Sequence, residues 1–189
     1  VSVDAQGRLH LKIKYMNGHW YCSEVYLANS LGWGKYLFWV NSRVDPFFTI
    51  DKFLVGGLFI YQNNNQEFDI EFSNWNGEAG PNNTQYVVQC QTKPTPPDHK
   101  NPFKMTLNGN YTSHFIEWNQ AFVKFTSIHG LYQDPPGDGY ITTPWPFSDP
   151  SDFPQPQNER VYINFWLYGS TPTIETREYE FIIEKFEFI

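Results

Sequence analysis

Three acidic residues lie two apart in the stretch QEFDIEF, residues 66–72, where Glu67, Asp69 and Glu71 alternate with apolar residues. On a β-strand, residues two apart share one face, so the acids would line one side while the apolar row faces a core. Neighbouring carboxyl groups can divide two tasks, because one can hold a proton while another stays ionised. Hydrolysis of a glycosidic bond needs that division. One acid protonates the leaving oxygen, and the other attacks or stabilises the sugar cation.

A row of acids on a strand is more often a solvated face of a sheet, and the C-terminal stretch EYEFIIEKFEFI has a similar pattern. The two stretches differ in their neighbouring cations. Between Lys52 and Lys93 the sequence contains no Lys or Arg, so the first row has no counterion nearby in sequence. Mutual repulsion predicts a raised pKa for at least one of its carboxyl groups, which favours a catalytic site.

The distance between the outer acids predicts a bent sheet. Glu67 and Glu71 are four residues apart, which is roughly 13 Å between Cα atoms on an extended strand. A retaining glycosidase needs carboxyl groups about 5 to 5.5 Å apart. Because long side chains converge on the concave side of a bent sheet, we expect the acids to face an open cleft there, with Asp69 between the two glutamates.

Alternating apolar residues recur along most of the chain and predict strands, and no window shows a helical face with caps. Many strands separated by clusters of Gly, Pro and Asn are typical of an all-β, antiparallel sandwich or barrel. The expected strands cover residues 8–13, 34–40, 55–61, 66–72, 84–89, 113–118, 121–128, 160–168 and 179–189.

Two segments interrupt this pattern: residues 93–102, a turn-rich connection, and residues 134–157, which hold seven of the fourteen prolines. Only about thirty residues follow the second segment, too few for a core of their own, so we expect one domain over residues 1–189. A long ordered loop in a compact domain is often functional. We predict that this loop borders the cleft and brings Trp145 or Phe147 towards a bound chain.

Composition narrows the class of protein. Aromatic residues make up 19% of the chain and charged residues 17%, a balance typical of a globular protein. The net charge of -7, without any block of Lys and Arg, argues against nucleic acid and anionic membranes as partners. No apolar run reaches the ~20 residues that a membrane-spanning helix needs.

Several short features favour export. Cys22 and Cys90 are enough for one disulfide, but two unpaired buried thiols are an equal alternative. The sequences NNT at Asn82 and NYT at Asn110 match the N-glycosylation acceptor pattern. We therefore expect a secreted or extracellular protein.

The motif EFDIEF resembles the E-x-D-x-E signature of glycoside hydrolase family 16, whose fold is a jelly-roll sandwich similar to concanavalin. The uninterrupted spacing is more similar to the lichenase and xyloglucan-acting branches than to the agarase and laminarinase branches. Other stretches resemble family segments in the family's order, so that the resemblance covers most of residues 3–189. They are WYCSEVYLANSLGWGKYLFWV (20–40), VGGLFIY (55–61), SHFIEWNQAFVKFTSIHG (113–130) and INFWLYG (163–169).

The resemblance implies a role for each acid: Glu67 would be the nucleophile, Glu71 the general acid/base, and Asp69 the helper between them. It also implies that Glu24, Trp33 and Trp166 line the cleft, and it matches His114 to a strand histidine of the family. Most of the seven tryptophans will be core. Trp75, three residues past the acid-bearing strand, and Trp145, in the long loop, are the better candidates for stacking on sugars. The substrate-binding residues we expect are therefore Glu24, Trp33, Trp75, His114, Trp145 and Trp166.

We expect a retaining endo-acting glycoside hydrolase or transglycosylase that cleaves a β-glucan-type polysaccharide. The alternative is a carbohydrate-binding jelly roll without efficient turnover. Two departures from the family pattern bear on this choice: Asn65 and Gln66 precede Glu67 where the family usually has a Trp, and Tyr26 stands where the lichenase-like branch often has Arg. We expect a monomer that binds a polysaccharide or oligosaccharide and needs no cofactor or catalytic metal. The resemblance also implies a structural calcium on the convex side, near Glu184.

Overall fold

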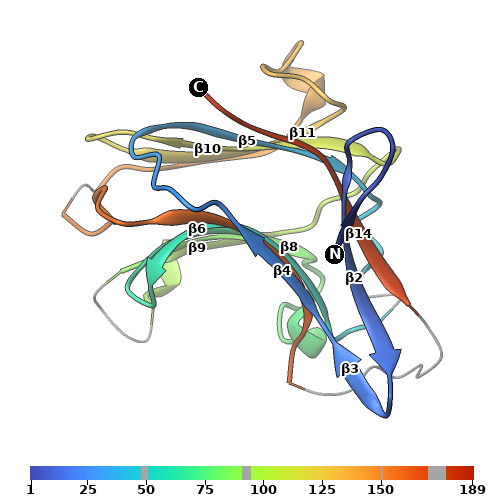
Figure 1. Cartoon of the computed structure of the whole chain (residues 1–189). Coiled ribbons are helices and arrows are strands. Elements are labelled where there is room, and N and C mark those ends of the chain that lie inside the picture. The colour runs from blue at the N-terminus through green and yellow to red at the C-terminus, as the bar shows by residue number, and fades with distance from the viewer. Residues whose placement is uncertain (48–50, 91–94, 150, 170–177) are drawn as a thin grey trace.

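The computed structural model describes residues 1–47, 51–90, 95–149, 151–169 and 178–189. Within these residues the chain forms two antiparallel sheets that face each other across a hydrophobic core (Figure 1). The expected all-β antiparallel sandwich is therefore confirmed. The helical elements of the described residues are three single-turn 3-10 segments, η1 (Trp75–Gly77), η2 (Pro97–His99) and η3 (Asp138–Tyr140).

The larger sheet contains eight strands among the described residues. Its order is β1-β2-β14-β5-β10-β11-β12, and β3 pairs with β2 beside this path. The bounds of its strands are β1 (Ser2–Val3), β2 (Leu9–Met16), β3 (His19–Tyr21), β5 (Gly34–Asn41), β10 (Tyr111–Trp118), β11 (Val123–His129), β12 (Ile141–Phe147) and β14 (Tyr179–Phe188).

The smaller sheet has six strands in the described part of the chain, in the order β4-β13-β6-β7-β8-β9. Figure 1 shows it bent into an arch whose hollow side faces away from the larger sheet. The acid-bearing strand β7 lies in the interior of this sheet, between β6 and β8. The strand bounds are β4 (Ser23–Tyr26), β6 (Leu54–Asn63), β7 (Gln66–Phe72), β8 (Thr84–Gln89), β9 (Lys100–Phe103) and β13 (Arg160–Leu167).

The apolar row of β7 anchors that strand in the core. Phe68, Ile70 and Phe72 are completely buried and belong to the cluster between the two sheets. Burying a side chain of this size contributes about 1.5 to 3 kcal/mol. Because side chains alternate along a strand, burial of this row directs the intervening acids to the hollow face. A register slip of one residue would exchange the two rows.

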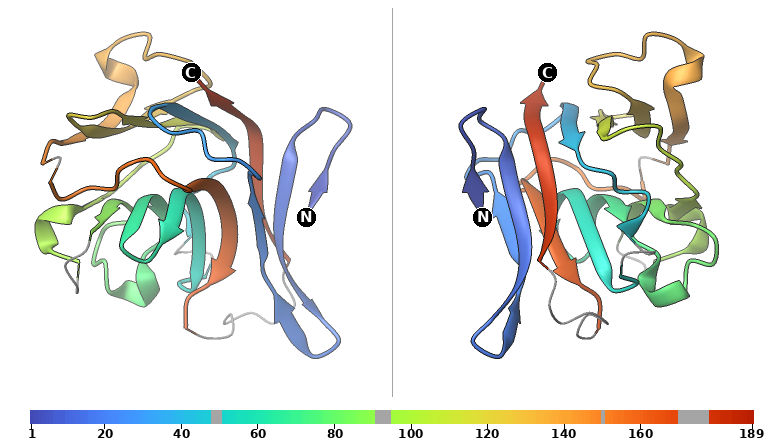
Figure 2. Two further views of the ribbon diagram at one scale, coloured as in Figure 1. Left: turned by 60° about the vertical axis from the view of Figure 1, so that its left-hand side comes forward. Right: turned by 90° about the vertical axis from the view of Figure 1, so that its right-hand side faces the viewer.

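The proline-rich segment 134–157 folds differently from the expected cleft-side loop. Residues Ile141–Phe147 form β12, which pairs with β11 at the edge of the larger sheet. An edge position accommodates Pro144 and Pro146, because a proline there costs no hydrogen bond to a further strand. The preceding element η3 stands on the outer side of the larger sheet, away from the arch (Figure 2).

Trp145 and Phe147 of this segment face the core. Trp145 stacks on Phe125, with ring centroids 5.4 Å apart and planes 26° from parallel. Phe147 meets the ring of His99 edge-on at 4.6 Å and packs against the same core. The prediction that this loop brings Trp145 or Phe147 towards a bound chain is therefore wrong, because burial of large rings between the sheets dominates their placement.

Neither cysteine of the described chain is in a disulfide: Cys22 is exposed and Cys90 is buried. Within the ranges given above, no helix has the length and apolar character needed to cross a membrane.

Candidate active site

The register of the smaller sheet sets the neighbours of each acid. Glu67, Asp69 and Glu71 all lie on β7 and face the hollow side. Opposite them, in the same order, stand Tyr61, Phe59 and Gly57 on β6 and Gln89, Val87 and Gln85 on β8. Each acid thus lies within a row of side chains that crosses the sheet.

A cleft formed by two adjoining hollows crosses this face. The first has a volume of about 290 Å³ and contains all three acids, and the second has about 530 Å³. Glu71 lines both, so the hollows meet at this residue. The other lining residues are Glu24, Gly57, Phe59, Tyr61, Tyr162, Asn164 and Trp166 in the first hollow, and Trp75, Glu78, Ala79, Gln85, Val87, Gln89, Lys100, Pro102 and Tyr168 in the second.

Asp69 is the central and most buried acid of the row, with 4% of its surface exposed. Burial raises the pKa of Asp69 well above its usual value, and the charges of Glu67 and Glu71 raise it further. Its carboxyl group hydrogen-bonds with the side chains of Glu67 and Gln89. The raised pKa favours the protonated form of Asp69, which can donate to the Glu67 carboxylate in this hydrogen bond.

Glu71 has a pKa suited to proton transfer. Burial raises the pKa of Glu71 to about 7, although Gln85 opposes this shift by donating from Nε2 to Oε2 at 2.6 Å. The negative charge of Glu67 raises this pKa, and the cation of Lys100 lowers it. Lys100 is the counterion that the local sequence lacks, brought to the cleft by β9. At neutral pH, Glu71 can act both as an acid and as a base.

A polar group lies beside the acids in the first hollow. Asn164 of β13 stands opposite Gly57 of β6 and opposite Glu24 of β4. Its Nδ2 donates to Oε2 of Glu24 at 3.4 Å. A Cβ atom at position 57 would lie 2.5 Å from Oδ1 of Asn164, so glycine is required there for this side chain to cross the strand. In the described part of the chain, Asn164 Oδ1 and Asp69 Oδ2 are buried acceptors without a hydrogen-bond partner, as expected where a ligand's hydroxyl groups bind.

Aromatic rings border the cleft on the Glu71 side. Trp75 meets Trp166 and Tyr168 edge-on, with ring centroids 6.1 and 5.1 Å away. The backbone of Trp75 is left-handed, with φ of 51°, and its N–H donates to Oγ of Ser73 at 3.0 Å. A non-glycine residue held in this conformation is strained, and such strain is concentrated at functional sites.

On the other side, a ladder of rings crosses β4, β13 and β6. Tyr162 stacks on Tyr26 at 5.3 Å and on Phe59 at 5.2 Å, and Tyr61 meets it edge-on. Phe59 stands opposite Asp69, so the ladder ends at the acid row. Sequence reasoning missed Phe59, Tyr61 and Tyr162, together with Gln85 and Lys100. The alternation of side chains along each expected strand was the available signal for these residues. The sequence does not show which strands pair, so it could not place them beside the acids.

His114 is not a cleft residue, so this prediction is wrong. It is fully buried on β10, where it hydrogen-bonds with Ser127 at 2.7 Å and Thr112 at 2.8 Å and contacts the ring of Phe72. Burial lowers the pKa of His114 to about 3, so the ring is neutral and packs as a core residue.

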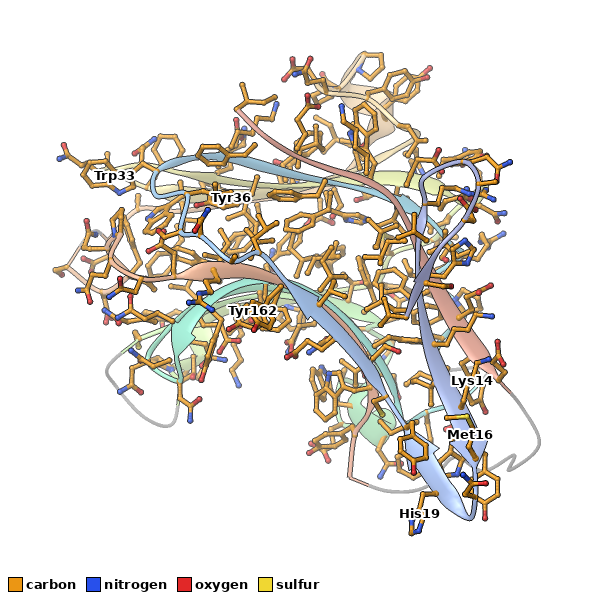
Figure 3. All side chains as sticks on the ribbon, in the orientation of Figure 1. Lys14, Met16, His19, Trp33, Tyr36 and Tyr162 are labelled. Carbon is orange, nitrogen blue, oxygen red and sulfur yellow. The ribbon has the colours of Figure 1, made fainter. Side chains whose placement is uncertain are left out.

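Trp33 also lies outside the cleft. It is 43% exposed and lines neither hollow. Figure 3 shows it at the outer end of the molecule, away from Tyr162. Of the expected binding residues, the structure thus brings Glu24, Trp75 and Trp166 to the cleft and leaves Trp33, His114 and Trp145 elsewhere.

Comparison with protein-family models finds no match, and comparison with curated proteins finds none either. Solved structures do match. A family 16 endo-glucanase from Bacteroides ovatus, in complex with G4G3G-2F-DNP, has a TM-score of 0.67 and 12% identity, covering 100% of this chain and 84% of its own. A β-1,3-1,4-glucanase (lichenase) from a mouse hindgut metagenome has a TM-score of 0.64 and 15% identity, covering 96% and 79%. A β-1,3-glucanase from Mycobacterium marinum has a TM-score of 0.62 and 11% identity, covering 96% and 73%.

These matches confirm, at the level of the fold, the resemblance to glycoside hydrolase family 16. The chain has the jelly-roll fold of those structures over nearly its whole length. Its hollow face carries a cleft with three adjacent carboxyl groups.

Proposed function

We propose that this protein is a retaining, endo-acting glycoside hydrolase or transglycosylase that cleaves a β-glucan-type polysaccharide. The observation that carries the proposal is the acid row itself: one open cleft holds three carboxyl groups, of which Asp69 and Glu71 have raised pKa values. The fold supports it, because the structures that share this fold include a lichenase, an endo-glucanase and a β-1,3-glucanase.

In the first step, Glu71 acts as the general acid. With a pKa of about 7, much of it holds a proton at neutral pH, and this proton passes to the glycosidic oxygen as the bond to the sugar breaks. The Glu67 carboxylate attacks the anomeric carbon on the opposite face and forms a glycosyl ester. The leaving chain departs with the proton of Glu71.

In the second step, the ionised Glu71 takes a proton from water or from a sugar hydroxyl group, whose oxygen attacks the anomeric carbon. The ester bond to Glu67 breaks, and its carboxylate is restored. Two inversions give net retention. Water as the acceptor gives hydrolysis, and a sugar hydroxyl gives transglycosylation.

Asp69 acts as a helper rather than as an acid in either step. Its raised pKa favours the protonated form, and a hydrogen bond donated to Glu67 would stabilise the carboxylate form of the nucleophile. A protonated Asp69 also limits the number of negative charges in the row, because a buried charge without a partner is costly.

The two hollows give the cleft room on both sides of Glu71, which suits internal cleavage of a long chain. Trp166 and Trp75 are the rings we propose for stacking on the sugars. The proposal includes secretion, a monomeric state and turnover without a cofactor. The calcium near Glu184 stays a prediction: Glu184 accepts from Nδ2 of Asn41 at 3.1 Å, and it belongs to no cluster of metal-binding side chains among the described residues.

The direct test measures both release and binding. Reducing ends released from lichenan, xyloglucan and laminarin would be quantified, and binding to each polysaccharide would be measured in parallel. We expect release from at least one of them, and its loss in Glu67→Gln. Binding without release would favour the alternative, a carbohydrate-binding jelly roll, for which the absence of a ring at Asn65 and Gln66 is the supporting observation.

A second test separates the two glutamates. Glu71→Ala should lose polysaccharide cleavage but still react with an aryl glycoside whose phenol leaves without protonation. The glycosyl ester then accumulates, because no base activates water. Azide needs no base, so it should restore turnover and give a glycosyl azide of retained configuration. If azide rescues Glu71→Ala no better than Glu67→Gln, the assignment of Glu71 is wrong.

A further inference from the structure

Outside the cleft, Cys90 and His99, nine residues apart, come together with Asp152 from a distant part of the sequence. Cys90 follows β8, His99 ends η2, and Asp152 lies beyond β12. Their ligand atoms all lie within 4.8 Å of one another. Among the residues that the structure describes, this is the one group of three or more His, Cys, Asp or Glu side chains with such spacing.

The hydrogen bonds of His99 orient its ring for metal binding. Nδ1 lies 3.1 Å from the carbonyl oxygen of Val88, which can only accept, so Nδ1 carries the proton. Nε2 then faces Oδ2 of Asp152 at 2.9 Å. In this tautomer Nε2 carries the lone pair that binds a metal ion, and the carboxylate of Asp152 lies beside it as a second ligand. Histidine ligands of metals are commonly held in this way, with the other ring nitrogen donating to a backbone carbonyl.

The surroundings form a partly closed site. Cys90 and His99 are each 3% exposed, and the ring of Phe147 packs edge-on against His99. Asp152 and Cys90 line a hollow of about 150 Å³. The buried ligands are therefore held in place, while the hollow provides an entry path and space for a water molecule.

We propose that Cys90, His99 and Asp152 bind one zinc ion, with water from the hollow as the fourth ligand. A thiolate, an imidazole and a carboxylate form a donor set that suits zinc and not magnesium or calcium, which prefer oxygen ligands. Binding would release the thiol proton of Cys90 and replace any proton on Nε2 of His99. The site would tie Asp152 to Cys90 and His99 beside β8, whose Gln89 stands opposite Glu67. This inference does not depend on the proposed glycosidase activity.

The test uses the full chain after treatment with a chelator. Cobalt(II) would be titrated first, because a thiolate ligand gives a charge-transfer absorption that carboxylates and imidazoles do not give. We expect one cobalt per chain with this absorption, and its disappearance when zinc displaces cobalt. Cys90→Ser should lose the absorption, and Asp152→Asn should weaken zinc binding at least about tenfold. Cys22→Ser is the matched control and should bind as the original protein does.

Circular dichroism would first establish that each variant is folded. If Cys90→Ser does not fold, Asp152→Asn still tests the site. The proposal is overturned if the folded protein gives no thiolate-to-cobalt absorption, since Cys90 is then not a metal ligand. It is also overturned if Cys90→Ser and Asp152→Asn both bind zinc as tightly as Cys22→Ser does, because the metal would then lie elsewhere.

Discussion

At the scale of single residues, the environment of the carboxyl groups distinguishes the acid row of the cleft from the acids of the C-terminal stretch. Glu178, in the C-terminal stretch of similar pattern, contacts Lys12 at 2.6 Å and Lys14 at 2.7 Å, and these hydrogen bonds lower the pKa of Glu178. Burial instead raises the pKa of Asp69 and of Glu71. Similar alternation in sequence thus gives pKa shifts of opposite direction in the fold. The missing counterions in the sequence predicted that pKa values in the acid row are raised, but burial is the larger cause of the shift.

The first prediction concerns pH. Because Glu71 must hold a proton in the first step, kcat/KM for polysaccharide should fall as the pH rises above about 7. Gln85 donates to the ionised form of Glu71, so Gln85→Leu should raise the pKa of Glu71 and move this fall to higher pH by about 1 to 2 units. The pH profile measures the shift, and Gln62→Leu, outside both hollows, is the matched control. If the alkaline limb of the pH profile does not move in Gln85→Leu, Glu71 is not the group that causes the loss of activity at high pH.

The second prediction concerns stability. The folded chain holds the Asp69 proton more tightly than the unfolded chain, so unfolding releases this proton above a pH of about 4, the unfolded pKa. The free energy of unfolding should therefore fall as the pH rises from there towards the raised pKa. Asp69→Asn removes this dependence and should be more stabilising at pH 8 than at pH 4, while activity decreases. Chemical unfolding at the two pH values measures the difference. An equal effect at both would show that Asp69 titrates alike in both states.

At the scale of elements, the alternation of apolar residues predicted the strands well, whereas the composition of the proline-rich segment predicted its structure poorly. The expected strand over residues 66–72 is β7 with the same bounds, because its apolar row can be buried in one way only. Residues 134–157 contain β12, which prolines concealed, since an edge strand tolerates them. The acids of the site were predictable from local spacing. Gln85, Lys100 and the ring ladder were not, because they reach the cleft through strand pairing between distant segments.

The third prediction contrasts two tryptophans. Trp75 lines the cleft, so Trp75→Ala should weaken oligosaccharide binding by roughly 1 kcal/mol with little change in stability. Trp145 packs on Phe125 in the core, so Trp145→Ala should lower the free energy of unfolding by about 3 kcal/mol and leave the affinity of the folded protein unchanged. Calorimetric titration and chemical unfolding measure the two quantities. If Trp145→Ala lost affinity and Trp75→Ala did not, the assignment of the cleft would be wrong.

At the scale of the whole molecule, the arch of the smaller sheet leaves the acid-bearing face of one strand, β7, open as a candidate site. Its inner face packs against the larger sheet (Figure 1). Its hollow face carries the cleft of two adjoining hollows. The fold is retained at 11 to 15% identity to the endo-glucanase, lichenase and β-1,3-glucanase structures. One architecture can persist at such a low sequence identity, because burial and strand alternation determine whether a position is apolar or polar more than which amino acid occupies it.

The central claim is that Glu67 forms a covalent bond with the sugar. A 2-fluoro β-glucan oligosaccharide with a dinitrophenolate leaving group should react once per chain, because the fluorine slows both steps while the good leaving group preserves the first. Mass spectrometry of the intact protein should show one added glycosyl unit. Peptide mapping should place it on Glu67, and Glu67→Gln should remain unlabelled. A label on Glu71, or polysaccharide turnover without any label, would contradict the account.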